Sequence, residues 1–109
     1  MFRQMEMPSP YPLRDLFDAA VRKRTVRLTC RRCRHVNSFP SAALWWLFQR
    51  RGWDDRFAAV CQRCICRHCL LRGDRIGNPR MTLTWETPLD QSLPMPSERD
   101  WKRERSRRR

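Results

Sequence analysis

Three Cys-x-x-Cys units constrain this chain more than any other feature of its sequence. They contain all of its cysteines, as the pairs Cys30/Cys33, Cys61/Cys64 and Cys66/Cys69. Each unit places two sulfurs on one tight turn, close enough to bind the same ion. Two such turns, brought together by folding, supply the four ligands of a tetrahedral structural zinc site. The spacing therefore predicts a small domain held together by one structural Zn2+.

Only two of the three units are needed for such a site. The predicted ligands are Cys30, Cys33, Cys66 and Cys69. The unit from Cys66 to Cys69 has a sequence similar to that of the upstream unit from Cys30 to Cys33. It lies beyond a helical pattern, where a metal-binding knuckle can form. Cys61 and Cys64 continue the apolar face of that helical pattern, where a free cysteine behaves as a small buried hydrophobe. They remain the alternative second pair.

Two histidines leave further ligand sets open. His35 and His68 each sit beside a ligand turn, so mixed Cys/His sites, or two metal ions, are alternatives. We expect both side chains to face solvent or to support a ligand rather than to bind the metal.

Length and charge set bounds on the class of protein. The chain has 109 residues and a formal net charge of +13, which fits one basic domain. Residues 11–87 are expected to form a zinc-ribbon-like domain between a flexible N-terminus, 1–10, and a basic disordered tail, 88–109. A hydrophobic core of this size contributes only about 3–5 kcal/mol to the free energy of unfolding, so a metal cross-link would supply stability that the fold otherwise lacks.

The sequence also favours a reducing compartment. Asp15 and Asp18 interrupt the only candidate for a secretory signal, and no apolar run is long enough to span a bilayer. We therefore expect a cytoplasmic protein that makes no membrane contact. In that setting, paired Cys-x-x-Cys units are metal sites more often than disulfides.

Hydrophobic periodicity predicts an α+β fold. The spacing of apolar residues indicates helices over 12–22, 40–51 and 56–63, and Gly52 is expected to end the second of them. Alternating β-branched residues indicate strands over 25–29, 35–39 and 81–86. The first two strands form a β-hairpin that presents the zinc knuckle. Trp45 and Trp46 are adjacent on a helix, about 100° apart, so at least one should be partly exposed.

The segment from 28 to 69 resembles small uncharacterised bacterial zinc-ribbon proteins. The residues that carry the resemblance are Cys30, Cys33, His35, Gly52, Asp54, Cys66 and Cys69. The extra cysteines at 61 and 64 depart from that pattern. The resemblance implies a zinc-binding fold and no known activity.

The chain lacks the motifs of zinc enzymes. A catalytic zinc needs an open coordination position and a nearby acid or base. Zinc deaminases place a His-x-Glu ahead of their Cys-x-x-Cys, but here Val36 and Asn37 follow His35. We expect no enzymatic activity and no small-molecule substrate.

Arginines gather around the predicted ligand turns. Every charged side chain from Arg22 to His35 is basic, and Arg67 lies in the opposing turn. The planar guanidinium suits phosphate, which predicts a DNA- or RNA-binding module with little sequence specificity. The predicted contacts are Arg27, Arg31, Arg32, Arg34 and Arg67.

Two other functions remain open. Five tryptophans in a small chain favour a protein-interaction adaptor or a small subunit of a larger assembly. The spare thiols Cys61 and Cys64 suggest a thiol/zinc redox switch.

Overall fold

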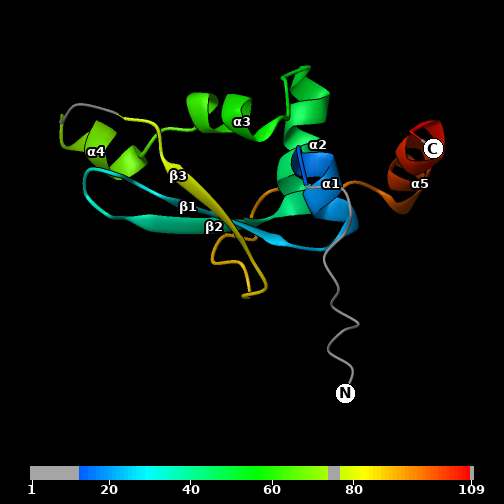
Figure 1. The fold of residues 1–109 in the computed structure, drawn as a ribbon, viewed down its shortest axis with the longest axis horizontal. Helices are drawn as coiled ribbons and strands as arrows, with labels where there is room; N and C mark the ends of the chain where they lie inside the picture. Colours follow the sequence, from blue (N-terminus) through cyan, green and yellow to red (C-terminus); the bar gives the residue numbers. More distant parts are fainter. Residues whose placement is uncertain (1–12, 74–76, 109) are drawn as a thin grey trace.

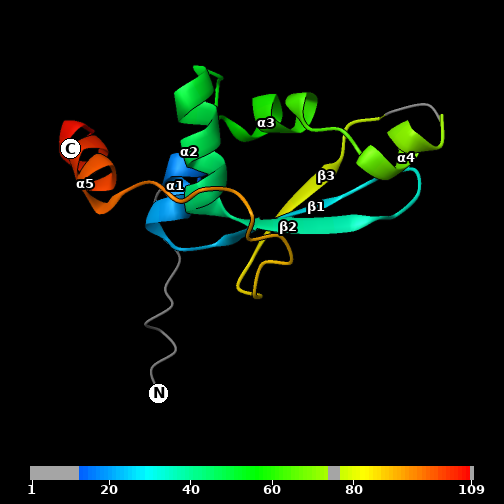
Figure 2. The same cartoon turned by 180° about the vertical axis from the view of Figure 1, so that it is seen from behind.

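A three-stranded antiparallel sheet lies at the centre of the computed structural model, which describes residues 13–73 and 77–108 (Figure 1). Its strand order is β2-β1-β3. The elements in chain order are α1 (Leu16–Val21), β1 (Thr25–Thr29), β2 (Val36–Pro40), α2 (Ser41–Arg51), α3 (Phe57–Arg63), α4 (Arg67–Leu71), β3 (Arg80–Thr84) and α5 (Glu98–Arg107). Helices α1, α2 and α3 lie on one side of the sheet, as the view from behind also shows (Figure 2). The predicted small α+β fold is confirmed.

The central strand β1 pairs with both other strands of the sheet. Val26 pairs with Phe39 of β2 and with Leu83 of β3, and all three side chains belong to the hydrophobic core or pack against it. Arg27 alternates with Val26 and therefore points to the opposite face. The predicted hairpin is confirmed, and the first cysteine turn connects its two strands beyond the pair formed by Thr29 and Val36.

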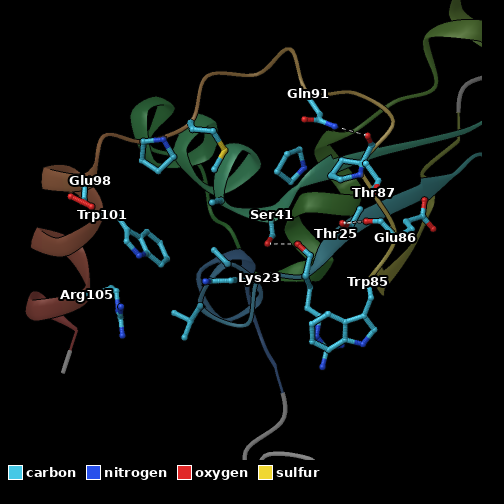
Figure 3. A pocket seen from close by; sticks show the side chains of 18 residues that line it. Lys23, Thr25, Ser41, Trp85, Glu86, Thr87, Gln91, Glu98, Trp101 and Arg105 are labelled. Atoms are coloured by element: carbon cyan, nitrogen blue, oxygen red, sulfur yellow. Dashed lines mark hydrogen bonds between the residues drawn. The ribbon is translucent and has the colours of Figure 1, made fainter. Parts of the chain in front are cut away.

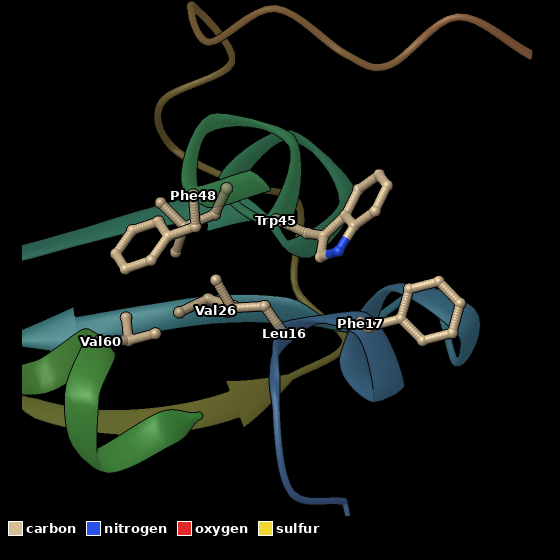
Figure 4. Close-up of a cluster of buried hydrophobic side chains, with 7 residues drawn as sticks. Leu16, Phe17, Val26, Trp45, Phe48 and Val60 are labelled. Carbon is tan, nitrogen blue, oxygen red and sulfur yellow. The ribbon is translucent and has the colours of Figure 1, made fainter. Parts of the chain in front are cut away.

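The core fills the space between the sheet and the helices above it (Figure 4). Its buried members are Leu16, Phe17, Val26, Leu44, Trp45, Phe48 and Val60. Trp45 is 1% exposed, whereas its neighbour Trp46 is only partly buried and packs at the edge. This confirms that the two adjacent rings cannot both lie at the centre of the buried face.

The helix ends follow local chemistry. α2 ends before Gly52, as predicted, and this glycine adopts a left-handed conformation with φ 68°. α1 begins at Leu16, later than predicted from Pro12, because Asp15 is its N-cap. The Asp15 carboxylate accepts a 2.9 Å hydrogen bond from the backbone N–H of Asp18. A side-chain cap satisfies an N–H that would otherwise lack a partner in the first turn.

The prediction of a basic disordered tail over 88–109 requires correction. Residues Glu98–Arg107 form α5, and Trp101 lies 5.3 Å from the rings of both Phe17 and Trp45. The Trp101 ring and the guanidinium of Arg108, which lies 4.2 Å from the centroid of the Phe17 ring, place this charged segment against the core. The predicted flexible segment 1–10 lies outside the described residues.

The helices of the described residues are short. α2 has 11 residues and α4 only five, and α4 occupies a region that the sequence predicted only as a turn. None of the described helices has the length and apolarity needed to cross a membrane.

Candidate metal centre

Four cysteine sulfurs converge at the end of the β1–β2 hairpin that faces α4. The cluster consists of Cys30, Cys33, Cys66 and Cys69, and all of its ligand atoms lie within 4.8 Å of one another. Sγ of Cys30 is 3.7 Å from Sγ of Cys69, and Sγ of Cys33 is 3.6 Å from Sγ of Cys66. A tetrahedron of thiolates with Zn–S bonds of about 2.3 Å has S–S edges of about 3.8 Å. The spacing of the four sulfurs therefore fits one tetrahedral metal ion.

Two different local structures deliver the sulfurs. Cys30 follows β1, and its backbone N–H donates to the carbonyl of His35 at 2.8 Å, which closes the hairpin turn. Within that turn, Arg34 adopts a left-handed φ of 67° and donates its N–H to the carbonyl of Cys30. On the other side, Cys66 is the N-cap of α4 and Cys69 lies inside that helix. Glycine is the usual residue for the conformation of Arg34, so the sequence carries no signal for it.

Backbone N–H groups point at two of the sulfurs. The N–H groups of Arg32 and Cys33 donate to Sγ of Cys30 at 3.4 and 3.5 Å, and that of Cys69 donates to Sγ of Cys66 at 3.5 Å. Such donors support thiolate ligands of a metal.

The thiols of the cluster differ in their affinity for protons. The N–H groups of Cys33 and Arg32 lower the pKa of Cys30 to about 6. Burial raises the pKa of the Cys69 thiol to about 12. A metal ion binds the thiolate form, so loading the site releases the protons that remain on the cluster.

The remaining two cysteines are separate from the cluster. Within the described residues, the cluster of metal-ligating atoms leaves out Cys61 and Cys64, which are half-buried on and just after α3. Burial raises the pKa of both thiols, that of Cys64 to about 11. The thiolate is the reactive form of cysteine, so these shifts weigh against a redox switch built on this pair.

The two histidines lie on the outside of the metal centre. His35 and His68 are both exposed, and their rings stack at 5.7 Å between centroids with an interplanar angle of 23°. Neither belongs to the four-residue cluster. This arrangement matches the solvent-facing positions expected for both.

Four of the five predicted phosphate-binding arginines flank the cysteines. We call them the knuckle arginines: Arg31, Arg32, Arg34 and Arg67. Each is exposed and sits on, or next to, a cysteine turn. The fifth, Arg27, lies in the middle of β1, where its guanidinium pairs with Glu86 at 3.1 Å. The structure therefore separates Arg27 from the group that surrounds the cysteines.

Comparison with models of known protein families, with curated proteins and with solved structures finds no match. The resemblance to bacterial zinc-ribbon proteins therefore stays a prediction.

Proposed function

We propose that this chain is a zinc-stabilised, non-enzymatic module that binds DNA or RNA through the phosphate backbone. Cys30, Cys33, Cys66 and Cys69 would hold one Zn2+ as a structural ion. Four thiolates fill a tetrahedral zinc and leave no open position for a substrate or a water. The role of the metal is then to fix the two turns that carry the arginines.

The observation that carries the proposal is that the knuckle arginines have no carboxylate partners. Among the described residues, none of the four forms an ion pair. Four thiolates exceed the charge of one Zn2+ by two, which offsets only part of a net charge of +13. Unpaired guanidinium groups on a rigid turn are suited to phosphate oxygens, which they bind as a planar fork.

The test is a salt titration with two charge-matched variants. Arg31→Gln/Arg32→Gln removes two charges at the metal centre, and Arg50→Gln/Arg51→Gln removes two exposed charges at the end of α2. Each phosphate contact contributes about 0.9 to the slope of log K against log salt for duplex DNA. We expect the first variant to reduce the slope by about 2 and the second to leave it nearly unchanged.

Two outcomes of the same titration would contradict the proposal. Equal losses from the two variants would mean that only total charge matters. Wild-type binding no stronger than that of a scrambled arginine-rich peptide would remove the proposal. Metal content and far-UV circular dichroism of both variants check that the fold is unchanged.

A second function is favoured by an apolar surface beside the metal centre. Ile65, Leu70 and Leu71 are 52%, 48% and 79% exposed on and next to α4. Large exposed apolar side chains concentrated between positions 65 and 71 are candidates for contact with a protein partner. One stoichiometric protein partner that survives nuclease treatment, and that is lost with Leu70→Ser/Leu71→Ser, would favour an adaptor over a nucleic-acid module.

A further inference from the structure

A pocket lies at the end of the sheet away from the metal centre, and Figure 3 shows the side chains that line it. Its volume is about 720 Å³, within the range of about 300–1,000 Å³ that is usual for ligand sites. It opens between α1 and α2 on one side and the segment from Trp85 to α5 on the other. Val21, Ala42, Met95 and Trp101 provide apolar walls.

Trp85 provides an aromatic surface at the mouth of this pocket. The residue is 64% exposed, and the guanidinium carbon of Arg24 lies 3.9 Å from the centroid of its ring. The guanidinium covers one face of the indole and holds the ring in place by a cation–π contact. Since 64% of the residue remains exposed beside this contact, the indole has accessible surface for a second planar group.

The charges around the pocket favour an anion. Lys23, Arg24 and Arg105 line it, and none of the three forms an ion pair among the described residues. Glu86 and Glu98 line it as well. Both carboxylates already form ion pairs. Glu86 pairs with the guanidinium of Arg27 in β1 at 3.1 Å, and Glu98 pairs with the ammonium of Lys102 in α5 at 3.8 Å. The unopposed charge at the pocket is therefore positive.

We propose that this pocket takes an unpaired base of a single-stranded nucleic acid. The base stacks on the accessible surface of Trp85, and the flanking phosphates meet Lys23, Arg24 and Arg105. Every base has a π-face, so this contact needs no particular sequence. A base inside a duplex is already stacked on both sides and cannot enter. The inference rests on the proposed function and deepens it by naming single strands as the preferred class of ligand.

The experiment separates bases from phosphates. Three ligands are titrated by fluorescence anisotropy at one salt concentration: an oligothymidylate of about 12 nucleotides, a strand of equal length without bases, and the corresponding duplex. The proteins are wild type, Trp85→Ala, Trp85→Phe and Leu89→Ala. Leu89 is 66% exposed and does not line the pocket, so it controls for loss of an exposed apolar side chain.

We expect wild type to prefer the oligothymidylate over both other ligands. Trp85→Ala should weaken binding of that strand about 5- to 150-fold, the usual effect of losing one stacked base. It should leave affinity for the base-free strand unchanged. Trp85→Phe should retain most of the affinity, because phenylalanine keeps an aromatic face, and Leu89→Ala should match wild type.

Several results would overturn the inference while leaving the proposed function standing. They are equal wild-type affinity for the strands with and without bases, equal losses for both strands in Trp85→Ala, and a preference for the duplex. Competition by free thymidine monophosphate at the same nucleotide concentration would make the pocket a mononucleotide site instead. If wild type binds no polyanion better than an arginine-rich peptide does, the proposed function itself fails.

Discussion

Replacement of Cys66 by serine isolates the contribution of the metal to the fold. Serine keeps the N-cap of α4, because its hydroxyl can accept the N–H of Cys69 as Sγ of Cys66 does. It removes one thiolate from the cluster. Sγ of Cys66 lies 3.6 Å from that of Cys33, which is 33 positions earlier in the chain. A cross-link that closes a loop of this length restricts the unfolded chain by about 4 kcal/mol. We therefore expect Cys66→Ser to lower the free energy of unfolding by about 4 kcal/mol.

That loss is comparable to the stability of the whole core, which is about 3–5 kcal/mol for a domain this small. Urea unfolding in reducing buffer, followed by tryptophan fluorescence, measures it, and elemental analysis of the same samples gives the metal content. Cys61→Ser is the matched control, since it makes the same chemical change outside the cluster. We expect the control to keep one metal ion per chain and to lose about 1 kcal/mol or less. A Cys66→Ser protein with one bound metal and an unchanged unfolding midpoint would refute the reasoning, as would metal loss in the control.

Three further outcomes test the docking of α5 and the spare thiols. Trp101→Ala should lower the free energy of unfolding by about 1–3 kcal/mol, because it removes two aromatic contacts worth about 0.5–1.5 kcal/mol each, with Phe17 and Trp45; an unchanged urea midpoint would contradict the docking. Burial alone would raise the pKa of Glu104, but hydrogen bonds from two arginines of the same segment lower it below that of an ordinary glutamate. The pKa of Glu104 is therefore lower in the folded protein than in the unfolded one, so its ionised carboxylate stabilises the fold at neutral pH and this stabilisation is lost as the pH falls below about 4. On acidification, the near-UV circular dichroism signal of Glu104→Gln should therefore decrease less than that of wild type. Burial raises the pKa of Cys64 to about 11, so iodoacetamide at neutral pH should alkylate this thiol about 100-fold more slowly than a free cysteine, as mass spectrometry can measure; rapid labelling would restore the redox alternative.

Patterns that depend on close neighbours in the chain were predictable from the sequence. The hairpin β1–β2 follows from alternating residues, and α2 follows from its apolar spacing and from Gly52. The convergence of Cys66 and Cys69 with the upstream pair was also predicted, because this unit lies beyond the helical pattern whose apolar face Cys61 and Cys64 continue.

Features that depend on distant contacts were not predictable. The helix α5 has a polar, highly charged sequence, and only its contacts with distant residues, such as those of Trp101 with Phe17 and Trp45, show why it is docked. Helix α4 has five residues, too few for an apolar period to be visible. The pocket beside Trp85 forms between segments that are far apart in the chain, so no local sequence pattern predicts it.

The strand β1 also fixes the distance between the Trp85 end of the sheet and the cysteine turns. Arg24, which packs on Trp85, directly precedes β1, and Cys30 directly follows it. The two residues are therefore about 20 Å apart along the strand. Both neighbouring strands pair with it, and a slip of one residue would turn every side chain to the wrong face, so this interval cannot stretch. A ligand that touches both ends must match a constant interval. The protein would then select by length and spacing along the ligand, without reading the identity of any base.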